Sequence, residues 1–156
     1  MAFLNSVNII GSGLTAQQLR LDIISENVTN SQTTRTENGG GAYRRKMVVF
    51  EAVSGRDSFR AALARASNGL ISNTTAAPVA GGVRVAEIVE DEDDPMKMVY
   101  DPTHPDANEE GYVELPNVDM VLEIADAMAA SRAFASNVTA FNTLKSVISS
   151  GLEIGR

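Results

Sequence analysis

The stretch LRLDIISENVTNSQTT, residues 19–34, decides the fold, because an apolar helical pattern runs there without a Gly or Pro stop into a cluster of Asn, Ser and Thr. From Val7 to Val28, apolar residues recur at spacings of four and three, and only Gln17 interrupts the line. This pattern predicts a helix over residues 3–28. A second apolar line through Ala16 predicts packing neighbours on two sides of that helix.

The C-terminal part repeats the pattern. Residues 118–153 carry the same spacing, interrupted only by Ser131 and Lys145, with a parallel line formed by Val121, Met128 and Ala135. They predict a helix about 50 Å long, starting near Pro116 or Asn117.

The sequence between the helices changes character. Four short runs with strand-like composition occupy residues 43–50, 83–89, 96–100 and 111–115, and Gly-rich or Asp-Pro segments separate them. A short helix is predicted over 57–67 and a loop over 72–82. The predicted fold class is therefore α+β, with long N- and C-terminal helices packed as a coiled-coil core and a small β-rich middle insert.

Composition excludes several classes of function. The 156 residues are 44% hydrophobic but only 5% aromatic, and the net charge of −7 argues against nucleic acid or an anionic membrane as the main partner. The absence of cysteine excludes disulfides, zinc–thiolate sites and thiol nucleophiles. No apolar run approaches the roughly 20 residues needed to span a membrane, and the first residues lack the basic region and cleavage site of a Sec signal peptide.

Candidate chemistry is sparse. His104, in DPTHPDANEEG, is either a general base or metal ligand or a solvated turn residue, and the lack of a second His or Cys favours the turn. The run EDEDD, residues 90–94, lacks the ligand pattern of a calcium loop, which favours a solvated acidic turn or a face for a basic partner. The basic run 44–46 either meets an acidic neighbour or forms a polar strand edge. We predict no catalytic residue, no metal and no cofactor.

Four asparagines lie close to the apolar lines: Asn27, Asn30, Asn137 and Asn142. They are either exposed polar positions or amides that hydrogen-bond across helix contacts and set the register. The sequence alone does not separate these two interpretations.

The text LTAQQLRLDIISENVTNSQTTRTENGGGAYRRKMVVFE resembles the N-terminal motif of the bacterial flagellar axial proteins of the rod and hook. The combination of VYDP, HPDAN, GYV and LPNV between residues 81 and 120 is similar to that of proximal rod members. The ending SRAFASNVTAFNTLKSVISSGLEIGR is similar to the closing helix of the family. Thr29, Leu122 and the pair Ala135-Ser136 depart from the usual family residues.

The resemblance covers residues 7–52 and 81–156, which leaves 53–80 as a variable loop. It implies an assembly domain made of residues 1–35 and 116–156, and a β-rich insert spanning 36–115. It also implies a structural subunit of the proximal rod in the basal body, which stacks helically in the periplasmic space and transmits torque to the distal rod and hook. The implied partners are other copies, other rod proteins, the rod-to-MS-ring adaptor and the flagellar type III export apparatus, with export that needs no cleaved signal peptide.

The expected assembly interface combines the apolar lines with nearby polar residues. Its members are Val7, Ile10, Leu14, Leu21, Ile24, Asn27, Val28, Asn30, Ile124, Met128, Arg132, Phe134, Asn137, Val138, Phe141, Ile148 and Leu152. Three other interpretations remain open: another axial subunit with the same terminal helices, a small hydrolase or metal enzyme centred on His104, and a self-contained helical domain.

Overall fold

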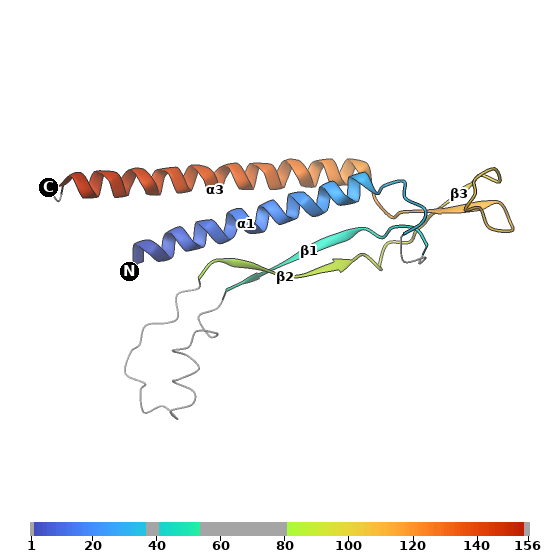
Figure 1. Cartoon of the computed structure of the whole chain (residues 1–156), viewed down its shortest axis with the longest axis horizontal. Helices are drawn as coiled ribbons and strands as arrows, with labels where there is room; N and C mark the ends of the chain where they lie inside the picture. The colour runs from blue at the N-terminus through green and yellow to red at the C-terminus, as the bar shows by residue number, and fades with distance from the viewer. Residues whose placement is uncertain (1, 37–40, 54–80, 155–156) are drawn as a thin grey trace, which may run out of the picture.

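The computed structural model describes residues 2–36, 41–53 and 81–154. Two long helices, α1 (Ala2–Thr29) and α3 (Met120–Ile154), lie antiparallel beside two small strand pairs (Figure 1). The strands are β1 (Lys46–Ala52), β2 (Val83–Glu90), β3 (Lys97–Tyr100) and β4 (Tyr112–Leu115). The predicted α+β class is confirmed, and both helices match their predicted spans to within two residues.

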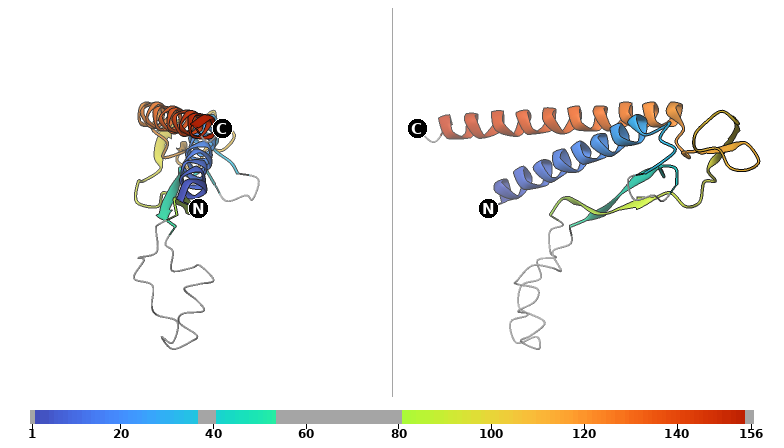
Figure 2. Two further views of the ribbon diagram at one scale, coloured as in Figure 1. Left: turned by 90° about the vertical axis from the view of Figure 1, so that its left-hand side faces the viewer. Right: turned by 45° about the vertical axis from the view of Figure 1, so that its right-hand side comes forward.

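The helix pair is joined through small side chains. Ala16 of α1 and Ala130 of α3 are buried, and Gly13 lies so close to Asn137 that a Cβ there would be 3.0 Å from the Asn137 Nδ2 atom. Small residues allow two backbones to approach closely. The helices converge where α1 ends and α3 begins, and they separate toward the two termini (Figure 2).

The β1–β2 hairpin lies along α1. The strands pair antiparallel from Lys46 opposite Glu90 to Ala52 opposite Val83, with one irregularity between Val49 and Phe50. At its far end the Ser12 hydroxyl accepts a 3.1 Å hydrogen bond from the Val83 amide, which fastens the hairpin to the helix. The predicted strand 43–50 begins only at Lys46, because the residues before it bond to other parts of the chain.

The β3–β4 hairpin projects past the end of the helix pair, away from both termini (Figure 1). Its strands pair from Lys97 opposite Leu115 to Tyr100 opposite Tyr112. The intervening loop is built by its own side chains: Asp101 Oδ1 accepts from the amide and hydroxyl of Thr103, and Asn108 Oδ1 accepts from the amides of Glu110 and Tyr112. Such bonds stabilise tight turns.

Two sequence predictions about boundaries need comment. Asp119, rather than Pro116 or Asn117, caps α3, because Asp119 Oδ1 accepts the amide hydrogen of Val121. The predicted helix 57–67, and most of the loops 53–80 and 72–82, lie outside the described residues. The division into a core of 1–35 and 116–156 and an insert of 36–115 stays a prediction.

Candidate functional site

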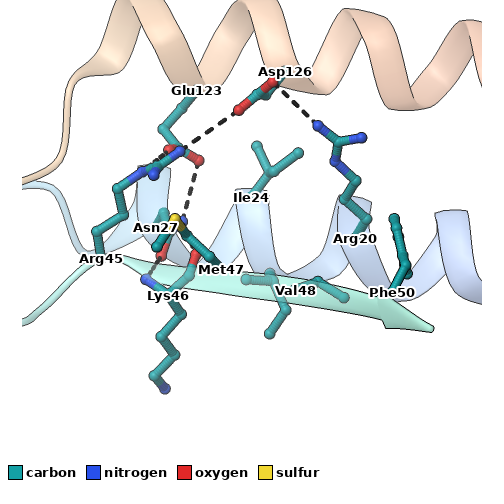
Figure 3. A pocket seen from close by; sticks show the side chains of 11 residues that line it. Arg20, Ile24, Asn27, Arg45, Lys46, Met47, Val48, Phe50, Glu123 and Asp126 are labelled. Atoms are coloured by element: carbon teal, nitrogen blue, oxygen red, sulfur yellow. Dashed lines mark hydrogen bonds and ion pairs between the residues drawn. The ribbon is translucent and has the colours of Figure 1, made fainter. Parts of the chain in front are cut away.

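A cluster of buried and half-buried polar side chains joins α1, the start of β1 and the start of α3. We call it the polar junction, and it consists of Asn27, Tyr43, Arg45, Lys46, Asp91, Asn117 and Glu123. Part of it lines a groove of about 280 Å³ between α1, β1 and α3 (Figure 3).

Asn27 is the centre of this junction and is 1% exposed. Its Nδ2 donates to the Lys46 carbonyl at 2.9 Å and to Glu123 Oε2 at 3.2 Å. Its Oδ1 accepts from the Tyr43 hydroxyl and from the Lys46 amide, both at 2.9 Å. Every hydrogen-bonding position of the amide is therefore occupied, and one side chain holds three segments together.

Glu123 lies in the first turn of α3 with no exposed surface, and Arg45 neutralises it. The Arg45 Nε donates to Glu123 Oε1 at 2.6 Å, and the guanidinium also lies 3.6 Å from Asp91 and 3.5 Å from Asp126. Burial alone would lower the pKa of Arg45, but the hydrogen bond to Glu123 and the nearby carboxylates raise it above its ordinary value. Arg45 therefore stays charged, and the buried carboxylate keeps its partner.

Asn117 and Asp91 extend the junction to the turn after β2. Asn117 Oδ1 accepts from the Arg45 amide at 2.8 Å, and its Nδ2 donates to the carbonyls of Asp91 and Asp94. Asp91 Oδ1 accepts from the amides of Asp93 and Asp94. In the predicted acidic turn 90–94, Asp91 is thus buried and structural, whereas Glu92, Asp93 and Asp94 are exposed.

Tyr43 and Lys46 close the other side of the junction. Lys46 pairs with Glu26 at 2.6 Å, and its ammonium lies 5.5 Å from the centre of the Tyr43 ring. Burial, followed by the negative charges of Glu26, Glu123 and Glu90, raises the pKa of Tyr43 well above its ordinary value. For Arg45 and Lys46, the interpretation that the basic run meets acidic neighbours is confirmed.

The polar atoms of the junction bond mainly to one another. A network of this kind holds chain segments in a fixed orientation. Only one arrangement of the segments gives every buried donor and acceptor a partner, so the network specifies that arrangement. His104 lies apart from it, in the loop between β3 and β4, where its Nδ1 accepts from the Asp106 amide at 3.1 Å. Among the described residues, no group of three or more His, Cys, Asp and Glu side chains could hold a metal ion.

The four asparagines behave differently. Asn27 hydrogen-bonds across a helix contact, and Asn137 packs against Gly13 of α1. Asn30 bonds locally to the Glu26 carbonyl and the Thr33 hydroxyl, near the end of α1. Asn142 is exposed. Both interpretations of these residues therefore apply, each at a different position.

The residues of the expected assembly interface fall into three groups. Buried positions are Ile24 and Asn27. Half-buried positions are Val7, Ile10, Leu14, Leu21, Val28, Asn30, Phe134, Asn137 and Ile148. Exposed positions are Ile124, Met128, Arg132, Val138, Phe141 and Leu152.

The exposed group shows how α3 is oriented. Its buried positions, Glu123 and Ala130, face α1, whereas Val121, Ile124 and Met128 are 50% exposed or more. Several large apolar side chains of α3 thus point outward, whereas the contact with α1 combines small and polar side chains, among them Ala130 and Glu123. The sequence analysis did not identify Tyr43, Asp91, Asn117 and Glu123 as members of one site. The acidic residue Glu123 inside an apolar helical pattern was nevertheless a visible signal.

No helix in the described part of the chain is long and apolar enough to cross a membrane.

Comparisons with known proteins identify the family. Residues 7–35 match the family model "Flagella basal body rod protein", and residues 109–154 match "Flagellar basal body rod FlgEFG protein C-terminal". The chain is 42% identical to the flagellar basal-body rod protein FlgC of Bacillus subtilis, and the alignment covers 100% of both chains. It is 40% identical to FlgC of Borreliella burgdorferi, over 99% of this chain and 98% of that protein, and 37% identical to FlgC of Salmonella typhimurium over 100% of both. The chain therefore belongs to the FlgC family of flagellar basal-body rod proteins, and it is a structural subunit of the rod.

Proposed function

We propose that this subunit assembles helically through exposed apolar side chains of its two terminal helices. In this arrangement, copies of the chain and other rod proteins form the proximal part of the shaft that transmits torque to the distal rod and hook. The observation that carries the proposal is the exposed apolar side of α3, where Val121, Ile124 and Met128 face away from α1.

Burial of such side chains favours association. Covering a Val, Ile or Met side chain completely contributes about 1.5–3 kcal/mol relative to leaving it in water. Isolated apolar residues on a surface need no explanation, but Val121, Ile124 and Met128 gather in the first part of α3, and such a cluster is typical of an interface. A contact that joins different faces of neighbouring copies does not close on itself and produces a helical stack.

The separation of the two helices toward their termini supports the same proposal. The pair is joined at the polar junction and through Ala16, Gly13 and Ala130, and the two helices separate toward their termini (Figure 2). Neighbouring subunits then provide the apolar surface that the monomer lacks, with the expected interface residues on both helices as their contacts.

The remaining parts of the proposal follow from the family. The subunit acts in the periplasmic part of the basal body, next to other rod proteins and the rod-to-MS-ring adaptor. It reaches that place through the flagellar type III export apparatus without a cleaved signal peptide. It has no catalytic role and requires no cofactor.

The experiment replaces Phe141 by Asp in the bacterium that encodes the chain. Phe141 lies five helical turns after Glu123 on the same side of α3, but it is 38% exposed, so α1 does not cover it and the polar junction and both hairpins should fold as before. A buried carboxylate at a subunit contact should prevent rod assembly and abolish swimming in soft agar. The matched control is Asn142→Asp, which places the same charge on the neighbouring exposed residue.

Swimming of the Phe141→Asp strain at the rate of the control strain would contradict the interface. Circular dichroism of the two purified variants checks that any loss of motility does not arise from unfolding.

A further inference from the structure

The first part of α3 has one exposed side, opposite the residues that face α1. Positions on this side are three or four residues apart, which places them in one row along the helix. We call it the outer side of α3, and its exposed members are Val121, Ile124, Met128, Arg132 and Ala135. Within the described part of the chain, the Arg132 guanidinium forms no ion pair or hydrogen bond. An apolar row with one unpaired cation suits a partner surface that is apolar and carries a carboxylate.

One face of the β3–β4 hairpin has these properties. Met98 lies directly opposite Glu114, and side chains that lie opposite each other in an antiparallel pair share a face. Tyr100 and Tyr112 form the next pair on the same face, so we call these four residues the tyrosine face. Tyr100 is 64% exposed and Met98 is 56% exposed. Glu114 is also exposed, and among the described residues its carboxylate has no ion pair or hydrogen bond.

The other face of the hairpin is partly open too, because Val99 is 45% exposed, but it differs in charge. Its members are Lys97, Val99, Val113 and Leu115. This face holds no carboxylate, and the Lys97 ammonium donates a 2.8 Å hydrogen bond to the Val118 carbonyl. Of the two faces, only the tyrosine face therefore combines exposed apolar side chains with a carboxylate that can pair with Arg132.

The tyrosine face is held in one conformation. The rings of Tyr100 and Tyr112 lie 5.3 Å apart, centroid to centroid, in an edge-to-face arrangement. Gly111 has φ +82°, and a Cβ there would lie 2.9 Å from Tyr100 Cε2, so this ring packs directly on the glycine. A side chain that is already ordered loses little entropy on binding. Aromatic residues, Met and Arg are also the residue types enriched at protein interfaces.

The two surfaces match in length and position. The outer side rises about 16 Å from Val121 to Arg132, and the four residues of β3 span roughly 13 Å. The hairpin projects past the start of α3, away from both termini (Figure 1). A second copy displaced along this axis by about the length of the hairpin therefore brings the start of its α3 beside the hairpin of the first. When Glu114 is level with Arg132, the two tyrosines are level with Met128.

We propose that the tyrosine face of one copy docks on the outer side of α3 of a second copy. Tyr100 and Tyr112 then pack against Met128, and Glu114 pairs with Arg132. Because every copy presents both surfaces, the contact joins different faces and repeats from copy to copy. This inference rests on the proposed function, since it names the contact through which copies of the rod subunit meet.

The first test uses the absence of cysteine from the chain. The variant with Met98→Cys and Ala135→Cys is expressed in the bacterium that encodes the chain, and its isolated basal bodies are treated with a short thiol-to-thiol crosslinker. Both positions are exposed and uncharged, so Glu114 and Arg132 stay in place. The expected result is a crosslinked dimer of the chain together with larger species, because each copy carries both halves of the contact.

The matched control keeps Ala135→Cys and replaces Val99, the next residue on β3, by Cys. Its thiol is accessible but leaves the strand on the other face, so the yield of dimer should be several-fold lower. Equal yields from the two variants would overturn the assignment of the tyrosine face.

Charge exchange provides the second test. Glu114→Arg alone, or Arg132→Glu alone, places like charges at the contact and should reduce swimming in soft agar several-fold. The double exchange should restore most of the swimming, because it re-forms the pair in the opposite sense. Both positions are exposed, and circular dichroism of the purified variants checks that each one folds. Failure of the double exchange to recover swimming would overturn the pairing of Glu114 with Arg132.

The crosslinking also separates this contact from the proposed function. Basal bodies that contain the Met98→Cys, Ala135→Cys chain but give no dimer, or a crosslink only to another rod protein, would overturn the docking contact alone. Basal bodies of the unmodified strain that lack the chain would instead overturn the proposed function, and the docking contact with it.

Discussion

The Asn27 amide donates a 3.2 Å hydrogen bond to the Glu123 carboxylate at a point where neither side chain reaches solvent. This contact joins the end of α1 to the start of α3, and Lys46 at the start of β1 and Arg45 just before it bind the same two side chains. The β1–β2 hairpin is therefore attached at the place where the two helices converge. We infer that the polar junction sets the angle between the helix pair and the strands.

Replacement of Asn27 by Ala should lower the free energy of unfolding by at least about 2 kcal/mol, because several buried donors and acceptors lose their partner at once. Urea unfolding followed by circular dichroism measures this change. Asn142→Ala, at an exposed position of α3, should remain within about 0.5 kcal/mol of the unmodified chain. Equal stability of the two variants would refute the role given to Asn27.

Glu123→Gln should destabilise the chain by about 3 kcal/mol, since it removes the charge that faces Arg45 in a buried site. In this variant Arg45 would still have Asp91 and Asp126 as more distant carboxylate partners. The loss of stability should therefore lie at the lower end of the range of about 3–5 kcal/mol for breaking a buried ion pair. The exposed residue Glu153 provides the control as Glu153→Gln. The comparison is again made by urea unfolding at neutral pH, and an unchanged midpoint for Glu123→Gln would show that the pair contributes nothing.

Stability should fall as the pH rises above about 10, the ordinary pKa of tyrosine. The pKa of Tyr43 is raised in the folded chain, so the folded state holds the phenol proton at a pH where the unfolded state has lost it. The unfolded state then binds fewer protons, and the slope for this group approaches about 1.4 kcal/mol per pH unit. Tyr43→Phe should be less stable at pH 7, having lost the bond to Asn27, but should show a shallower decline above pH 10. Parallel pH profiles for the two chains would rule out this effect.

Gly82→Ala should release the β1–β2 hairpin from α1. Gly82 has φ +103°, and an added Cβ would lie 2.2 Å from the Ser12 Oγ that accepts the Val83 amide hydrogen. Backbone strain and the displaced hydroxyl together should cost about 2 kcal/mol or more. At Gly81 the same methyl group meets only Val53, at an ordinary 3.8 Å, so Gly81→Ala should leave stability unchanged or slightly raised. Thermal unfolding of the two variants separates these outcomes, and identical transitions would contradict the attachment.

The two terminal helices, the four strands and the α+β class were predictable from the sequence. Apolar residues that recur every three or four positions define a helix, and short β-rich runs between turn residues define strands, without reference to any distant part of the chain. The two apolar lines on each helix also indicated neighbours on two sides. The motifs around VYDP and HPDAN indicated the family by resemblance. In the structure, Asp101 and Asn108 of these motifs build the loop through local hydrogen bonds.

The tertiary structure decided which apolar line is used inside the chain and which is left outside. Periodicity places Ile124 and Met128 on the predicted interface, but it does not reveal that α3 turns Glu123 and Ala130 toward α1 instead. Nor does it bring Asn27, Arg45 and Glu123 together, since they are separated by up to 96 residues. The helical repeat is a local property of the backbone, whereas the partner of a buried charge depends on long-range packing. The sequence by itself therefore determined the elements and the family, and only the folded chain determined that small and polar side chains join the two helices while several large apolar side chains of α3 face outward.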